Sequence, residues 1–249
     1  MDTPKFKKSK GFFILLLIPI LFIAIGLICL SFCGKHGYVI AIDAGHGGSD
    51  PGAVGIIKET ELTEGTIKYL EEYLRNDENY TPVLCRQYGQ TTSIQQRNQT
   101  AAKAKADLLL SVHANSAADA NASGFECYPA PPGRGNHDTS VRFAGLLTEE
   151  MYSIGSTIRG SNGIRYAYYI PDSNGKSQKK LIDSSDDTVY NYSSFGMVEN
   201  KNCPAVLAEQ CFITNADDVA FLGTDNGYRL AAKAYYKAIC RYFGTIPKI

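Results

Sequence analysis

Three side chains that could move protons or bind a metal each follow an apolar run of the kind that forms a buried strand. His46 lies in the glycine-rich stretch 43–53, and His113 and Glu209 each end a run of apolar residues. Imidazole and carboxylate groups bind zinc, and imidazole exchanges protons near neutral pH. If the strands are parallel, their carboxyl ends meet at one edge of the sheet, so these side chains should lie together. The sequence therefore predicts a hydrolytic metal site at that edge.

A zinc ion with an open coordination position takes about three protein ligands. His46 and His113 supply two imidazoles, and the third ligand should be a carboxylate near the glycine-rich stretch. Glu59, Glu61 and Glu64 all lie at or just after the start of the first predicted helix. Their spacing does not choose among them.

The hydropathy pattern predicts the elements that must position these residues. Strands are expected at 38–43, 82–86, 107–113, 124–128, 164–170 and 204–209, and helices at 61–75, 91–106, 139–152 and 228–243. Strands that alternate with helices are typical of an α/β domain, here a single three-layer domain over 38–246 with a central, mostly parallel sheet flanked by helices. The polar stretch 171–192 is expected to be a surface loop, with a substrate-contacting lid as the alternative.

The N-terminal segment has the pattern of a membrane anchor. A basic tail over 1–10 precedes an uncharged apolar run over 11–33, which is long enough to span a bilayer, and 34–37 form a short linker. The basic flank favours a cytoplasmic N-terminus, so we expect a single-pass protein of the cell membrane with its domain on the cell-wall side. A cleaved signal peptide is the alternative, but the run lacks a small-x-small cleavage site.

Composition excludes several other classes. Lysine plus arginine equal aspartate plus glutamate at 25 each, so no overall positive charge indicates nucleic-acid binding. The seven cysteines form no Cys-x-x-Cys pair, which argues against a thiolate zinc site, and most should be small buried apolar groups. The chain also lacks a His-Glu-x-x-His helix motif and a Gly-x-Ser-x-Gly motif.

Four stretches resemble, in the same order, the motifs of the zinc-dependent N-acetylmuramoyl-L-alanine amidases. They are Asp-Ala-Gly-His-Gly-Gly-Ser-Asp-Pro-Gly-Ala-Val-Gly at 43–55, Lys-Glu-Thr-Glu-Leu at 58–62, Ser-Val-His-Ala-Asn at 111–115, and Pro-Ala-Val-Leu-Ala-Glu at 204–209 with Phe-Ile-Thr-Asn at 212–215. Arg86 and Arg97 also fall where that family carries arginines. Glu64, Gly65 and Cys211 depart from the pattern, but none of them is a proposed ligand.

The resemblance implies one zinc ion held by His46, Glu59 and His113, with Glu209 as the catalytic carboxylate. It implies that a zinc-activated water cuts the amide between the lactyl group of N-acetylmuramic acid and L-alanine of the stem peptide, so that peptidoglycan is the partner. Asp43 and Asn115 are expected to lie next to the ligand residues and orient them. Arg97 is expected to form an ion pair or to contact the substrate.

Two alternatives remain at this point. A zinc peptidase acting on the same stem peptides would share the ligand set and cut a different bond. A membrane-tethered peptidoglycan-binding protein with a dead site should have lost a ligand or the catalytic glutamate, whereas all four positions are filled.

Overall fold

A five-stranded sheet organises the part of the chain that the computed structural model describes, residues 37–199 and 202–249. The strand order is β2-β1-β3-β7-β4, and β4 alone among these runs antiparallel to its neighbour. The strands are β1 (Tyr38–Ala44), β2 (Tyr80–Leu84), β3 (Leu108–Asn115), β4 (Glu126–Pro129) and β7 (Ala205–Phe212). The predicted α/β domain with a mostly parallel sheet is confirmed.

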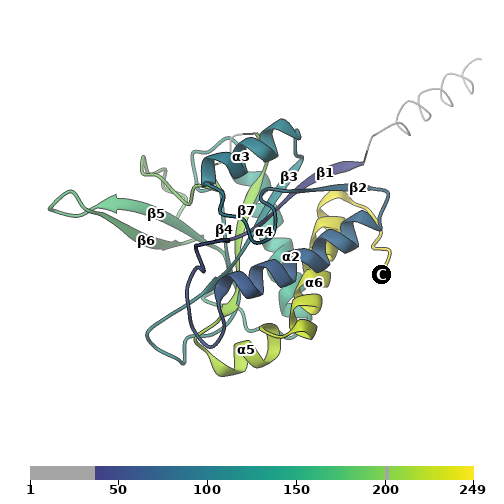
Figure 1. Ribbon diagram of the computed structural model, residues 1–249. Coiled ribbons are helices and arrows are strands. Elements are labelled where there is room, and N and C mark those ends of the chain that lie inside the picture. Colours follow the sequence, from purple (N-terminus) through teal and green to yellow (C-terminus); the bar gives the residue numbers. More distant parts are fainter. Residues whose placement is uncertain (1–36, 200–201) are drawn as a thin grey trace, which may run out of the picture. The chain divides into compact units, whose positions relative to one another are not determined.

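Helices cover both faces of this sheet (Figure 1). Alternate residues of a strand point to opposite faces, so Ile40 and Ile42 pack in one core while Ala41 packs in the other. The first core contains residues of α2 (Glu59–Arg75), α4 (His137–Ser153), α5 (Ala216–Leu222) and α6 (Asp225–Phe243), and the second contains Ala101 of α3 (Ile94–Lys103). The result is the expected three-layer arrangement, with more helix on one face.

The polar composition predicted a loop over 171–192, but part of this stretch forms a strand. Residues Ser177–Asp183 form β6, which pairs antiparallel with β5 (Arg165–Pro171), and the hairpin projects from the body of the domain (Figure 1). Its turn is built by Asp172, whose side chain accepts the backbone N–H groups of Asn174 and Lys176, and by Gly175 at φ 77°. Because β6 pairs on one side only and is largely exposed, its sequence lacks the apolar alternation of a core strand.

Element boundaries shift where the site is built. Helix α2 begins at Glu59, two residues earlier than predicted, and β3 and β7 continue beyond His113 and Glu209. Two of the expected strand-end residues therefore lie in the carboxyl halves of their strands, side by side, because His113 and Glu209 are register partners.

The predicted basic tail and membrane anchor, residues 1–33, lie outside the described residues, as does most of the linker. Within the described ranges, no helix is long and apolar enough to cross a membrane. The five cysteines of the domain are all buried, whereas the usual behaviour of free cysteine predicted burial of most of them; they are Cys85, Cys127, Cys203, Cys211 and Cys240.

Candidate metal centre and active site

The chain leaves β1 through a tight loop that presents His46. His46 has a φ of 59°, a left-handed conformation that a non-glycine residue adopts only when its surroundings hold it there. Gly45, just before it, must lack a side chain because a Cβ at this position would lie 2.4 Å from the His113 ring. The glycine therefore allows the two imidazoles to approach, with ring centroids 5.0 Å apart.

Glu59 begins α2 and ties the loop to it. Its backbone N–H donates to the Ala53 carbonyl at 3.0 Å, and its Oε2 accepts the Ala53 N–H at 2.9 Å. Its Oε1 accepts the backbone N–H of Ala114 at 3.1 Å. A carboxylate in the first turn of a helix is also favoured by the helix dipole. These bonds hold a buried, ionised carboxylate at the edge of the sheet.

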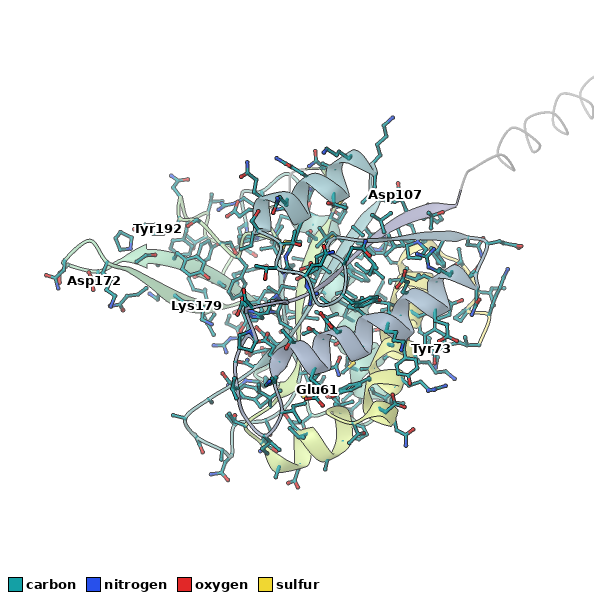
Figure 2. The ribbon with its side chains drawn as sticks, in the orientation of Figure 1. Glu61, Tyr73, Asp107, Asp172, Lys179 and Tyr192 are labelled. Atoms are coloured by element: carbon teal, nitrogen blue, oxygen red, sulfur yellow. The ribbon has the colours of Figure 1, made fainter. Side chains whose placement is uncertain are left out.

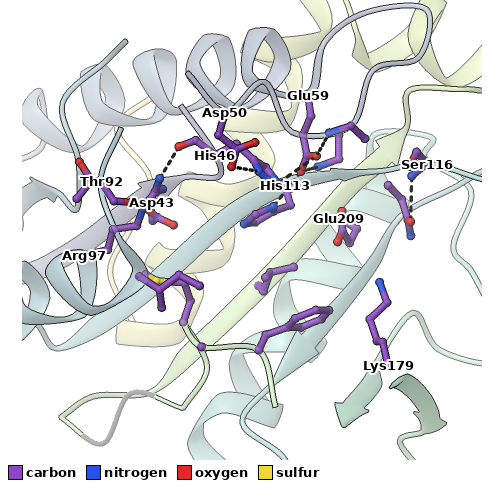
Figure 3. Close-up of a pocket in the computed structure, with 18 of the residues that line it drawn as sticks. Asp43, His46, Asp50, Glu59, Thr92, Arg97, His113, Ser116, Lys179 and Glu209 are labelled. Atoms are coloured by element: carbon purple, nitrogen blue, oxygen red, sulfur yellow. Dashed lines mark hydrogen bonds and ion pairs between the residues drawn. The ribbon is translucent and has the colours of Figure 1, made fainter. Parts of the chain in front are cut away.

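His46, Glu59 and His113 come together in one cluster (Figure 3). His46 Nε2 lies 3.2 Å from Glu59 Oε2, and His113 Nδ1 lies 2.8 Å from Glu59 Oε1. One potential ligand atom from each residue lies within 4.8 Å of the others, so the group could hold a metal ion. Of the three candidate carboxylates, Glu61 is exposed and Glu64 accepts from Arg86 at 2.6 Å, which leaves Glu59 in the cluster.

Glu209 lies beside this cluster in a cleft of about 510 Å³. The cleft is lined by all four residues, and its far wall is made by the β5–β6 hairpin and residues 195–197. The Glu209 Oε2 atom is buried and has no hydrogen-bond partner among the described residues. A buried carboxylate oxygen without a partner is costly, which points to a ligand or reacting group as its partner.

The electrostatics of these groups are strongly coupled. The hydrogen bond with Glu59 is the main cause that raises the pKa of His46 to about 9, against an opposing effect of burial. Burial alone would raise the pKa of Glu59, but hydrogen bonds from His113 and His46 hold it well below its usual range. Burial raises the pKa of Glu209 to about 7.

Two arginines hold the loop from behind. Arg97 donates to Asp43 Oδ1 at 2.9 Å, to the Ala44 carbonyl at 2.7 Å and to the His46 carbonyl, while Arg86 donates to the Ala44 and Gly45 carbonyls. Asp43 also accepts the Ser111 hydroxyl at 2.7 Å. Arg97 and Asp43 are both buried and stabilise the loop. They also form the ion pair that was expected for Arg97.

Asn115 lines the cleft and donates to Glu126 Oε1 at 2.6 Å. Glu126 is buried, lies opposite Glu209 in the β4–β7 pair, and also accepts from Arg159 and Arg165 at 3.2 Å each. The sequence pattern singled out Asn115 but not its partners, because Glu126 lies in β4, Arg165 in β5 and Arg159 in the loop before β5, with no motif spacing among them.

Asp50 and Lys179 are two further residues of the cleft that sequence reasoning missed. Asp50 Oδ2 lies 2.8 Å from His46 Nδ1, which directs the other ring nitrogen toward Glu59. The motif at 43–55 already contained Asp50, four residues after the histidine, so this pairing had a signal in the sequence. Lys179 lies in the polar stretch that was expected to be a loop. No alternation of apolar and polar residues there indicated a strand or the face on which Lys179 would lie.

The donor set fits zinc. Two imidazole nitrogens and one carboxylate are ligands that zinc prefers, and an adjacent unpartnered carboxylate suits a hydrolytic site with an open coordination position. Glu59 lies between the two imidazole rings, and a divalent cation bound there would neutralise its negative charge.

Comparison with known proteins identifies the family. A model of the N-acetylmuramoyl-L-alanine amidase family (Amidase_3) matches residues 40–241. The chain is 30% identical to the protein YqiI of Bacillus subtilis, over 84% of this chain and 86% of that one. It is also 30% identical to the N-acetylmuramoyl-L-alanine amidase LytC of Bacillus subtilis, over 83% of this chain and 36% of LytC.

A solved structure agrees with this match. The catalytic domain of CwlV, an N-acetylmuramoyl-L-alanine amidase of Bacillus (Paenibacillus) polymyxa var. colistinus, is 26% identical with a TM-score of 0.66, covering 84% of this chain and 99% of that one. The family match covers the sheet except the first two residues of β1, and it includes the His46–Glu59–His113 cluster and Glu209. The chain therefore belongs to the N-acetylmuramoyl-L-alanine amidase family.

Proposed function

We propose that this protein is a zinc-dependent peptidoglycan amidase that cuts the amide between the lactyl group of N-acetylmuramic acid and L-alanine of the stem peptide. The observation that carries the proposal is the His46–Glu59–His113 cluster beside Glu209, in a cleft of a chain that belongs to this family. Family membership favours the amide bond over a peptide bond within the stem, and the complete set of four residues favours an enzyme over a dead copy.

In this proposal His46, Glu59 and His113 hold one zinc ion. When bound, the ion supplies Lewis acidity, which polarises the scissile carbonyl and acidifies the attacking water. The loop backbone, fixed by Arg97 and Arg86, keeps the His46 imidazole in place, and Asp50 holds its tautomer.

Glu209 carries the proton. Its carboxylate accepts a proton from the attacking water and returns it to the leaving nitrogen of L-alanine. A buried carboxylate with its pKa near neutrality can do both, since it neither holds the proton too tightly nor releases it too easily.

The N-terminal run supports a proposal for location. Residues 11–33 would anchor the chain in the cell membrane, with the basic tail 1–10 in the cytoplasm and the domain facing the cell wall. The short linker 34–37 would keep the domain close to the membrane surface.

The activity is tested by digestion of purified peptidoglycan followed by mass spectrometry. We expect intact stem peptides that begin with L-alanine, together with glycan free of peptide. The Glu209→Gln variant should retain zinc and lose roughly 100-fold or more of the rate, the range for a missing general base. Fragments cut within the stem peptide would instead identify a peptidase, and full activity of Glu209→Gln would remove Glu209 from this role.

A further inference from the structure

The wall of the cleft opposite the metal cluster contains a lysine whose position the proposed chemistry does not use. Lys179 lies on β6, on the part of the hairpin nearer the domain, whereas Asp172 lies toward its tip (Figure 2). Its side chain extends into the cleft on the side of Glu209 (Figure 3), and both residues line that cleft.

The register of the hairpin fixes which side of the strand faces the cleft. Lys179 pairs with Tyr169 on β5, and Tyr169 also lines the cleft. Lys180 pairs with Tyr168 and, by strand alternation, points to the other face. The two adjacent lysines therefore have different surroundings, although they are indistinguishable in the sequence.

Lys179 packs against an aromatic side chain and faces the Glu209 carboxylate across the cleft. Its Nζ lies 5.5 Å from the centroid of the Phe195 ring, and Phe195 contacts Tyr169 edge to face at 6.1 Å. Nearby, Leu207 and Leu181 continue this apolar surface. The Phe195 ring attracts the ammonium through this cation–π contact, and both residues line the cleft.

The guanidinium of Arg97, which also lines the cleft, already has hydrogen-bond partners within the protein. Within the described part of the chain, Arg97 and Lys179 are the arginine and lysine residues that line the cleft. Arg97 is buried and occupied by Asp43 and backbone carbonyls. Lys179 forms no ion pair with a described residue. An ammonium held over an aromatic wall and facing an open cleft is suited to an anion of the substrate.

We propose that Lys179, with the Tyr169–Phe195 wall, binds a carboxylate of the stem peptide close to the scissile amide. This inference rests on the proposed amidase function and adds a preference among its substrates. The carboxylate can come from the residue that follows L-alanine or from the C-terminus of the peptide. Blocking either as an amide removes the charge and leaves the scissile bond untouched.

The test uses the full-length protein and three synthetic disaccharide tripeptides. One carries both carboxylates free, the second has isoglutamine in place of isoglutamate after L-alanine, and the third has an amidated C-terminus. For the wild type we expect kcat/KM to fall roughly 5-fold, through KM, when the recognised carboxylate is amidated, the magnitude of a partly exposed ion pair. The substrate that shows the fall identifies the carboxylate.

The matched variants are Lys179→Met and Lys180→Met on the same strand. Lys179→Met should cleave the free and amidated substrates equally well, Lys179→Arg should keep the preference, and Lys180→Met should behave as the wild type. Both positions are exposed, so the thermal midpoint should not change.

Two results would overturn the inference while leaving the amidase in place: a wild type indifferent to amidation, or a preference that persists in Lys179→Met. If Lys179→Met lowered kcat equally on all three substrates, this would also overturn the inference, since the lysine would then act on Glu209 instead of a substrate carboxylate. A wild type that cleaves none of the three would overturn the proposed function and this inference with it.

Discussion

Glu209 shows at the scale of one residue how the position proposed for catalysis lowers stability. Its carboxyl is buried and its Oε2 has no hydrogen-bond partner among the described residues. In the unfolded chain the same group is surrounded by water. The folded protein therefore holds a proton on Glu209 over a range of pH in which the unfolded chain has released it.

This difference predicts a stability effect of fixed sign in the metal-free protein. As pH rises from 4.5 to about 7, the unfolded chain loses the proton first, so stability falls through this window. Glu209→Gln cannot ionise, so at about pH 8 it should be more stable than the wild type by about 3 kcal/mol, and at about pH 4 it should show no gain. Urea denaturation of both metal-free proteins at the two pH values measures this. A variant of equal or lower stability at the higher pH would contradict it.

The raised pKa of His46 predicts how zinc binding depends on pH. Its pKa is raised to about 9 in the metal-free protein, chiefly by the hydrogen bond with Glu59, so it is protonated at neutral pH. Zinc needs the neutral imidazole, so the apparent affinity should rise about tenfold per pH unit below about pH 9. Competition with a chromophoric chelator at several pH values measures the slope. An affinity independent of pH would show that His46 is neutral before the metal arrives.

At the scale of elements, the loop between β1 and α2 carries most of the site. It turns tightly enough to bring His46 against His113, and Glu59 closes it by pairing with Ala53 at both its backbone and its side chain. The two arginines satisfy the loop carbonyls that a sheet neighbour would otherwise bond. The positions of His46 and Glu59 relative to His113 therefore depend on the whole loop.

Gly45→Ala tests this close approach. A Cβ there would lie 2.4 Å from the His113 ring, so the ring must move and the cluster should lose zinc. We expect zinc content to fall below stoichiometric and activity to fall roughly 100-fold, since misplacement of a catalytic group by about 1 Å has this effect. Gly145→Ala, in α4 with open space around it, is the control and should keep full zinc content. A zinc-replete, active Gly45→Ala would show that the loop can widen freely.

At the scale of the whole molecule, the domain and the N-terminal run have separate parts in the proposal. The family match covers residues 40–241 and excludes the apolar run. Peptidoglycan is an extended solid substrate, so a tethered enzyme would reach only the wall nearest the membrane. The anchor would thereby set where the enzyme acts and leave its chemistry unchanged.

Cell fractionation tests the anchor. The full-length chain should enter the membrane fraction, resist extraction by salt and be released by detergent, because an apolar run of this length partitions into the bilayer. A chain lacking residues 1–33 should be soluble and should still cleave small disaccharide peptides at the wild-type rate. Mature protein whose mass lacks the first 33 residues would indicate a cleaved signal peptide instead.

Much of the architecture could be predicted because its signals are local. The apolar runs that became β1, β3 and β7 have a hydropathy pattern that does not depend on their neighbours, and their alternation with helices indicates a parallel sheet. The hairpin was missed for the opposite reason. Strand β6 pairs with one neighbour only and is largely exposed, so nothing in its composition separates it from a solvated loop.

By itself, the sequence determined the chemistry that is available: His46, Glu59, His113 and Glu209 in motifs of recognisable order, on a fold that brings strand ends together. Only the tertiary structure decided which groups meet. It placed Glu59 between the imidazoles while Arg86 took Glu64, buried Asp43 and Arg97 behind the loop, and turned Lys179 into the cleft and Lys180 away. The physical reason is that residue type and spacing are local, whereas burial, register and ion-pair choice depend on segments far apart in the chain.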